Sequence, residues 1–163
     1  MKLLTPDDIR ESFVNASKGE ASRVPMPGLH DVIWEQREYL GWRDPGSPQR
    51  GYLVAWRDGL PVGIVLRASG TRLQAGSAIC SLCNTPQPAN QVTMFSATRA
   101  GEAGKRGDSV GTYICADLAC SLLIRIAPPP FEMQPSPDEV VASRAAGLEA
   151  RLHAFTERVL QAA

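Results

Sequence analysis

The four cysteines of this chain fall into two close pairs, and this pattern constrains the fold more than any other feature. Cys80 and Cys83 form a C-x2-C pair, and Cys115 and Cys120 form a C-x4-C pair after a long insert. A tetrahedral zinc ion needs four soft or borderline ligands from two directions. The first pair suits a tight knuckle, and the second suits a ligand just before a helix followed by one in its first turn. The sequence therefore predicts one structural Zn²⁺ held by all four cysteines.

Other interpretations of the cysteines explain less. Two disulfides require an oxidising compartment, and the N-terminal residues do not resemble an export signal. A redox C-x2-C would leave the second pair without a role, and unconnected buried thiols seldom fall into two close pairs. A catalytic zinc keeps one coordination position open, whereas four cysteines fill the shell. The two histidines, His30 and His153, belong to no metalloenzyme motif and are expected to be solvated or capping residues.

The composition indicates one domain, and its net charge favours no particular class of binding partner. The chain has 163 residues and a formal net charge of zero. A free-standing nucleic-acid-binding domain usually carries a basic excess, although zero net charge leaves room for a local basic patch. No apolar run approaches the roughly 20 residues of a membrane span. We expect a cytoplasmic, soluble protein with no membrane association and no small-molecule substrate.

The N-terminal part is expected to contain one short helix and one ambiguous segment. Thr5 can cap a helix that begins at Pro6, and Asp8 completes a capping box. Lys18 and Gly19 are typical of a helix end, so we expect the helix to stop there. The apolar residues of segment 29–40 recur at no regular spacing, and helix is only slightly favoured over irregular structure.

Two β-hairpins are expected in the middle of the chain. The first surrounds the turn dipeptide Asp58-Gly59, and the second carries a glycine-rich, basic tip and ends at Cys115. The expected strands are residues 51–56, 61–67, 91–97 and 110–114. A helix over residues 116–125 should then carry the last cysteine. Knuckle, hairpin and helix together form a treble-clef zinc finger at residues 77–126. The predicted fold class is α+β, a small antiparallel sheet with flanking N- and C-terminal helices.

Residues 128–163 are expected to form a proline-rich link and an amphipathic helix outside the main domain of residues 1–127. Ser136 caps this helix and Glu139 completes a capping box. Its apolar stripe consists of Val141, Ala145, Leu148, Leu152, Phe155 and Val159. The stripe either folds back on the domain or seals a dimer, and the sequence leaves both open.

The basic hairpin tip is the candidate partner-binding segment. It carries Arg99, Lys105 and Arg106 among glycines, but it matches neither a Walker motif nor a dinucleotide-binding fingerprint. A solvated tip and a contact loop for an acidic protein surface or an RNA backbone both fit this pattern. Arg125 is a candidate for offsetting the negative charge of a zinc centre with four thiolates. The acidic residues of the ambiguous segment, Asp31, Glu35 and Glu38, are expected to be solvated, so no catalytic pair is predicted.

Three segments resemble a known family. Residues 101–122 read GxxGKRGDSVGTYICADLACSL, residues 39–45 read YLGWRDP, and residues 63–67 read GIVLR. Together they are similar to the FBP family, elongation-factor-G-binding proteins with a C-terminal treble-clef zinc finger that are related to fusidic-acid resistance proteins. The resemblance covers roughly residues 3–126 and leaves out the C-terminal helix.

The resemblance implies a non-enzymatic zinc protein that binds elongation factor G and acts on its release from the ribosome. The family's zinc ligands carry over onto Cys80, Cys83, Cys115 and Cys120. The resistance proteins carry a helical bundle ahead of the finger domain, whereas this chain has one short helix there, so it resembles a compact branch. Ribosomal RNA is a further expected partner, and an RNA-binding treble clef is the alternative function.

Overall fold

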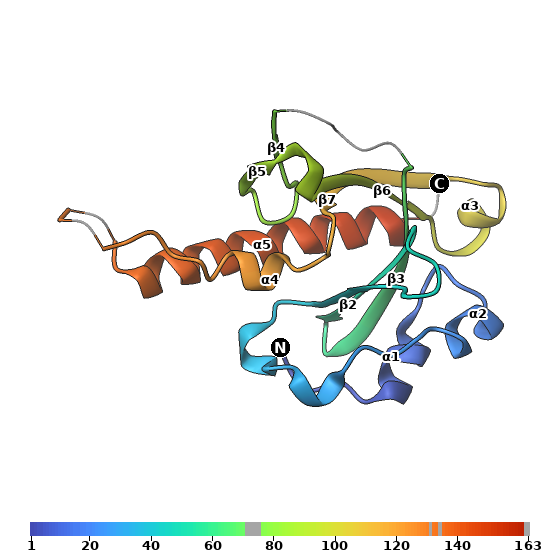
Figure 1. Cartoon of the computed structure of the whole chain (residues 1–163). Helices are drawn as coiled ribbons and strands as arrows, with labels where there is room; N and C mark the ends of the chain where they lie inside the picture. The colour runs from blue at the N-terminus through green and yellow to red at the C-terminus, as the bar shows by residue number, and fades with distance from the viewer. Residues whose placement is uncertain (71–75, 131, 134, 162–163) are drawn as a thin grey trace.

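The computed structural model describes residues 1–70, 76–130, 132–133 and 135–161. Its centre is a five-stranded antiparallel sheet with the strand order β1-β2-β3-β6-β7 (Figure 1). These strands are β1 (Leu40–Arg43), β2 (Arg50–Arg57), β3 (Leu60–Ala68), β6 (Val92–Thr98) and β7 (Ser109–Cys115). A separate two-stranded sheet pairs β4 (Ser77–Ile79) with β5 (Pro86–Pro88). The predicted α+β class with an antiparallel sheet is confirmed.

The helices are short except for the last one. They are α1 (Pro6–Ser12), α2 (Lys18–Ser22), α3 (Gly101–Lys105), α4 (Cys120–Leu123) and α5 (Pro137–Leu160). Single 3-10 turns occur at η1 (Leu29–Asp31), η2 (Trp34–Gln36) and η3 (Ala89–Gln91). None of the helices in the described parts of the chain is long and apolar enough to span a membrane.

The β2–β3 hairpin forms the middle of the sheet as the sequence predicts. Its turn consists of Asp58 (φ 49°) and Gly59 (φ 81°). Positive φ at both central residues is the backbone geometry that matches the twist of two-residue hairpins, and it explains the Asp-Gly dipeptide. The register places Pro61 opposite Trp56 near the turn, where β3 has only just begun.

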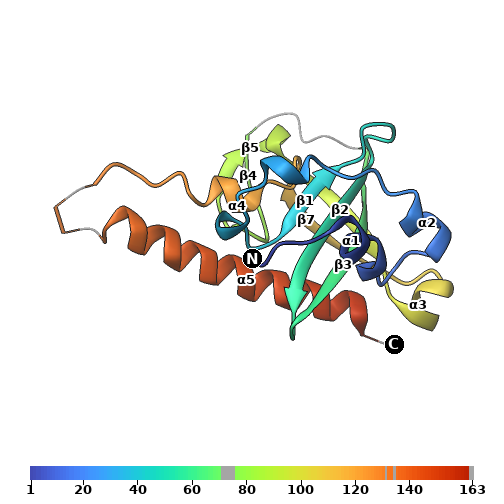
Figure 2. The same ribbon diagram turned by 90° about the horizontal axis from the view of Figure 1, so that it is seen from below.

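Side chains alternate between two apolar cores on the two faces of the sheet. On β2, Leu53 lies in one core, whereas Tyr52 and Val54 lie in the other. The Leu53 core also contains the four cysteines and the buried side of α5, which runs along this face (Figure 2). The Tyr52 core contains Phe13 and the N-terminal segments. The zinc finger and the N-terminal helices therefore pack on opposite faces of one sheet.

The N-terminal helix is interrupted earlier than the sequence predicts. The capping box of Thr5 and Asp8 is present, but α1 ends at Ser12 because the next residues lie along β3. Val14 donates a backbone hydrogen bond to the Gly63 carbonyl at 3.0 Å. Lys18 and Gly19 do not end this helix, since a second capping box on Ser17 starts α2.

The ambiguous segment at residues 29–40 forms no continuous helix. It contains η1 and η2, followed by the start of β1. Asp31 and Glu35 lie on different 3-10 turns, so they do not share a helix face with Glu38.

Asn15 closes a gap in the sheet between β3 and β6. These strands pair over only two residues each and then separate. The Asn15 side chain accepts a hydrogen bond from the Val65 amide at 2.8 Å and donates to the carbonyl groups of Val65 and Thr98, both at 3.0 Å. One amide side chain thus satisfies backbone groups that a regular ladder would have paired.

Helix α5 folds back on the domain. Its Ser136–Glu139 capping box is present, and it buries Leu148, Leu152, Phe155 and Val159 of the predicted stripe. At its C-terminal end, Arg99 donates to the Arg158 carbonyl at 2.8 Å, and the Ala100 amide donates to Val159 at 2.8 Å.

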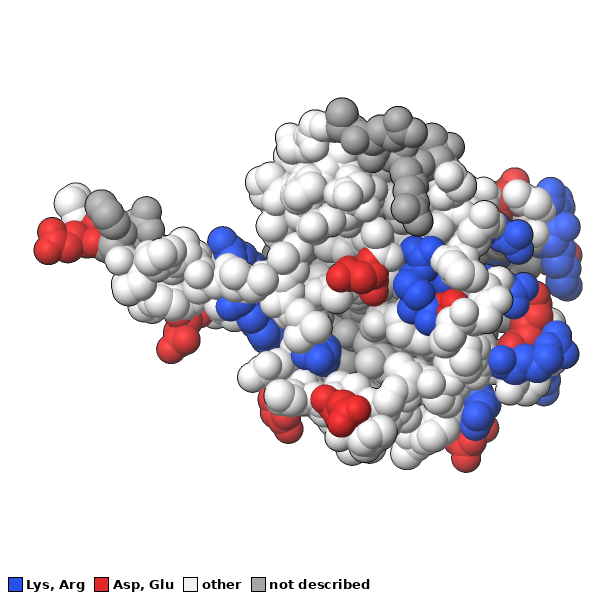
Figure 3. All heavy atoms as spheres, in the orientation of Figure 1, with Lys and Arg blue, Asp and Glu red and all other residues white. Residues whose placement is uncertain are grey.

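Charged side chains are unevenly spread over the face shown in Figure 3. Lys and Arg gather toward the side that carries α2 and α3, with acidic groups interleaved, whereas the surface over β4 and β5 is almost free of charge. The zero net charge of the chain thus coexists with a local basic edge.

We expect Asn15→Ala to lower the free energy of unfolding by about 2 kcal/mol, because it leaves the partly buried backbone groups of Val65, and the more exposed carbonyl of Thr98, without the side chain that pairs them. Urea titration followed by tryptophan fluorescence measures this loss. Asn90→Ala, which truncates an exposed asparagine of η3, is the matched control and should shift the midpoint little. Equal midpoints for the two variants would contradict the bridging role of Asn15.

Candidate metal centre

The four cysteines come from two parts of the chain that the fold brings together. Cys80 directly follows β4, and Cys83 lies three residues later in the turn toward β5. Cys115 is the last residue of β7, and Cys120 is the first residue of α4. The Ser81 amide donates to the Tyr113 carbonyl at 2.7 Å, which ties the knuckle to β7.

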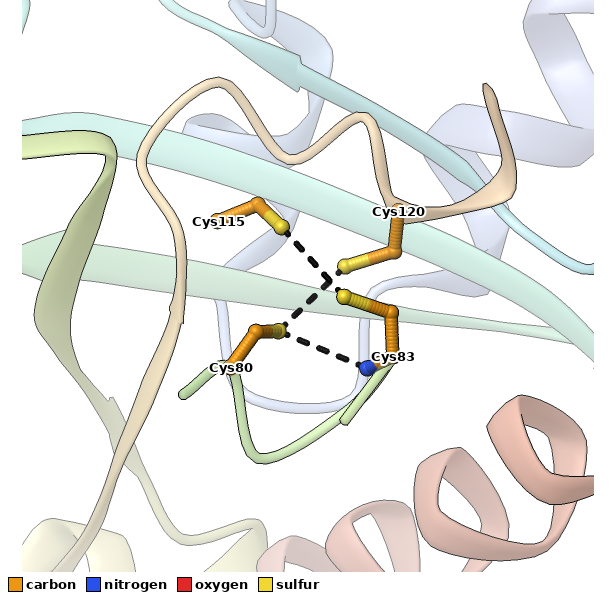
Figure 4. Close-up of side chains that lie close together, drawn as sticks. All are labelled: Cys80, Cys83, Cys115 and Cys120. Carbon is orange, nitrogen blue, oxygen red and sulfur yellow. Dashed lines mark hydrogen bonds between the residues drawn. The ribbon is translucent and has the colours of Figure 1, made fainter. Parts of the chain in front are cut away.

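All four sulfur atoms point toward a common centre (Figure 4). They lie within 4.8 Å of one another, with 3.6 Å between Cys80 and Cys120 and 3.7 Å between Cys83 and Cys115. A tetrahedral site with Zn–S bonds of about 2.3 Å places its sulfur atoms about 3.8 Å apart. A disulfide requires about 2.05 Å, so the observed spacing fits a shared metal ion. Each cysteine is at most 3% exposed, which makes the centre closed.

The electrostatics of the cluster favour a divalent cation. Hydrogen bonds from Cys115 and Cys120 lower the pKa of Cys80 to about 7. The interactions of Cys120 with Cys115 and Cys80 raise the pKa of Cys120 well above its usual value. Neighbouring thiolates repel one another, so protons come off only part of the cluster unless a metal replaces them. The donor set and its geometry therefore fit one structural Zn²⁺.

Backbone and side-chain donors surround the sulfur atoms. The amides of Leu82 and Cys83 both donate to Cys80 Sγ at 3.4 Å, as expected of a knuckle. The Gln87 side chain donates to Cys115 Sγ at 3.2 Å from a buried position on β5. Burial, followed by the charge of Cys120, raises the pKa of Tyr39 well above its usual value and keeps its hydroxyl protonated beside the cluster. Nothing in the spacing of Gln87 or Tyr39 identified them from sequence.

The segment between the last two cysteines differs from the predicted helix over residues 116–125. Only Cys120–Leu123 is α-helical, and residues 116–119 form a turn. The Asp117 side chain accepts a hydrogen bond from the Ala119 amide at 3.0 Å, which competes with helix formation. Leu118 has a φ of 62° and a fully buried side chain, so packing holds it in a backbone region that leucine rarely adopts.

The predicted partner-binding cations have different surroundings. Lys105 and Arg106 are exposed at α3 and its end, beside Glu102 and Asp108. Arg99, from the same hairpin, instead caps the C-terminal end of α5.

Arg125 forms a bidentate ion pair with Glu38. The two nitrogen–oxygen distances are 2.8 and 3.0 Å, and the Glu38 side chain is only 5% exposed, so the expectation that Glu38 is solvated is wrong. Burial alone would raise the pKa of Glu38, but hydrogen bonds from Arg125 and Ser121 bring it below its usual value. The charge of Arg125 is therefore matched by a carboxylate, and the pair joins the segment after α4 to the segment before β1.

The comparisons with known proteins agree with this geometry. The family model described as the FBP C-terminal treble-clef zinc finger matches residues 8–159. The chain belongs to the FBP family. The match includes most of α5, so the resemblance extends beyond the residues 3–126 expected from sequence.

One solved structure extends the FBP comparison. The structure of the fusidic acid resistance protein FusC is similar with a TM-score of 0.61 and 16% sequence identity. The similarity covers 98% of this chain and 60% of FusC, so the chain spans about three fifths of that protein. At this identity the likeness shows a shared fold. No curated protein sequence matches the chain.

We expect Cys115→Ser to remove the metal and to unfold the finger, because the binding free energy of a structural zinc is largely folding free energy. Metal analysis should find about one zinc per wild-type chain and much less in the variant, with a melting temperature lower by well over 10 °C. Ser109→Ala, an exposed change at the start of the same strand, is the control. A Cys115→Ser protein with full metal content and an unchanged melting temperature would contradict the site.

The Glu38–Arg125 pair predicts a pH-dependent contribution to stability. The pKa of Glu38 is lowered in the folded state, so this contribution is present above the unfolded-state pKa and is lost as pH falls through the folded-state pKa. Glu38→Gln should cost about 2 kcal/mol near neutral pH and progressively less in acid. Unfolding of zinc-loaded wild type and variant at each pH measures the difference, with Glu35→Gln as the exposed control. A difference that does not shrink in acid would refute this assignment.

Proposed function

We propose that this FBP-family protein is a non-enzymatic zinc protein that binds translation elongation factor G and influences its release from the ribosome. The observation that carries the proposal is a closed four-cysteine centre on a fold matched by the FBP model. The sequence resemblance to elongation-factor-G-binding proteins supplies the partner. The likeness to a protein named for fusidic acid resistance supports the same process. A factor of translation places the proposed interaction in the cytoplasm.

The buried metal centre supports a binding role rather than catalysis. Its four thiolates would fill the tetrahedral shell and leave no position for a water molecule or a substrate. The sulfur atoms are also out of reach of solvent, since each cysteine is at most 3% exposed. The zinc would therefore hold the finger together and present its surface to a partner.

The proposed contact is the basic edge at α3. The side chains of Lys105 and Arg106 are 73% and 60% exposed, and buried Ala103 fixes α3 to the domain. Their acidic neighbours form surface pairs, which contribute little and are readily exchanged for other partners. The internal bonds of Arg99 and Arg125 occupy those side chains, so the proposal relies on Lys105 and Arg106. Exposed cations on a fixed element suit an acidic protein surface.

A Lys105→Ala/Arg106→Ala variant should bind elongation factor G from the same organism five- to tenfold more weakly, because it removes two rim charges. Calorimetric titration of the zinc-loaded protein into the purified factor measures this, and higher salt should weaken the wild type more than the variant. A Lys2→Ala/Arg37→Ala variant removes the same charge and is the control. Lys2 follows the N-terminal residue, whose amine donates to the Arg37 carbonyl, and the N-terminus lies away from α3 (Figure 1).

The outcomes test the proposed partner and the proposed contact surface separately. Absence of binding by the wild-type protein at tens of micromolar would overturn the partner. Wild-type binding that the α3 variant leaves unchanged would remove this edge from the interface. A fluorescence titration with structured ribosomal RNA tests the alternative, and saturable binding at moderate salt would favour an RNA-binding treble clef.

A further inference from the structure

A side chain of α5 reaches the backbone of the zinc knuckle. Arg151 donates from Nε to the carbonyl oxygen of Leu82 at 2.5 Å, and Leu82 lies between the two knuckle cysteines. The two residues are 69 positions apart in the chain, so this contact exists only in the folded protein. Arg144, two turns earlier on the same helix, donates instead to the Ile126 and Ile124 carbonyls at 2.9 and 3.4 Å.

The peptide group that Arg151 contacts also donates to a metal ligand. The carbonyl of Leu82 and the amide of Cys83 belong to one peptide unit, and this amide donates to Cys80 Sγ at 3.4 Å. A cation at the oxygen draws electrons toward it and makes the amide a stronger donor, because hydrogen bonds in a chain polarise one another. The positive charge of Arg151 thus strengthens the hydrogen bond from the Cys83 amide to Cys80 Sγ through a single peptide group.

Among the described residues, no carboxylate neutralises the charge of Arg151. Arg151 has no ion pair within the parts of the chain that the structure describes. Arg125, the sequence-based candidate for offsetting the zinc centre, is instead matched by Glu38. A centre with one Zn²⁺ and four thiolates carries a net charge of −2, so an unmatched guanidinium bonded to its knuckle stabilises it.

The helix makes room for this arrangement. Gly147 lies one turn before Arg151, and a Cβ atom at position 147 would lie 3.0 Å from Arg151 Nη2 and 3.1 Å from Nη1. Glycine in a helix interior costs about 1 kcal/mol relative to alanine, so its presence calls for a structural reason. The space that it leaves lets the guanidinium fold back over the preceding turn and reach the knuckle.

We propose that Arg151 is a positioning residue for the zinc centre, which couples the docking of α5 to the retention of the metal. Linkage makes the effect reciprocal. Loss of Arg151 weakens zinc binding, and loss of the metal weakens the packing of α5 on the domain. Outer donors of this kind usually change metal affinity by 10–100-fold. The role is independent of which partner the protein binds.

The test compares Arg151→Met with Arg144→Met. Both substitutions remove hydrogen bonds between α5 and the finger, but only Arg151 contacts the knuckle. Competition with a colorimetric zinc chelator should show about tenfold weaker zinc binding for Arg151→Met and less than twofold change for Arg144→Met. In the Co²⁺-substituted protein, the thiolate-to-cobalt charge-transfer bands should shift only in Arg151→Met. Arg151→Lys, which keeps the charge and a donor, should restore most of the affinity.

Three results would overturn the proposal. They are unchanged zinc affinity in Arg151→Met, equal losses in both methionine variants, and charge-transfer bands that do not move. If Arg151→Met does not fold, Arg151→Gln replaces it, because glutamine keeps a polar donor and removes the charge. Zinc affinity of Arg151→Gln equal to that of the wild type would then exclude an effect of the Arg151 charge on the zinc centre.

Discussion

The rest of this structure depends on the binding of one divalent cation by four thiolates. Without the cation the thiolates repel one another. The two halves of the cluster lie far apart in the chain, and Cys83 and Cys115 meet only if β4, β5 and the β6–β7 hairpin adopt one mutual arrangement. Because the four cysteines are buried, the same site forms part of the apolar core. The metal and the core therefore form together, and neither is complete without the other.

Side chains that bond to distant backbone groups hold the remaining elements to this centre. Asn15 joins β3 to β6 where regular pairing ends, Arg99 closes the last turn of α5, and Arg151 reaches the knuckle. Each contact satisfies carbonyl groups that no strand or helix pairs. These side-chain hydrogen bonds fix the elements of a short, turn-rich chain in place without longer strands.

Sequence reasoning succeeded where the signal is local and failed where tertiary contacts decide. The Asp58-Gly59 turn and the Ser136 capping box depend on neighbouring residues, and both are present. The break between α1 and α2 arises from pairing with β3, and the turn at Leu118 arises from burial of that side chain, so propensity did not reveal them. The cysteine cluster was predictable because metal ligands carry their spacing in the sequence. Gln87 and Arg151 act on those ligands from elements whose position only the fold defines.

The position of α5 also has a consequence for biosynthesis. Phe155 and Val159 complete the core that contains the cysteines, yet they follow Cys120 by more than thirty residues. The ribosome delivers the chain from its N-terminus, so all four ligands emerge before the helix that covers them. A nascent chain at that stage can gather its metal ligands while an apolar face of the sheet is still open to solvent. This interval is when chaperone capture or aggregation competes most strongly with folding, and it ends when α5 docks.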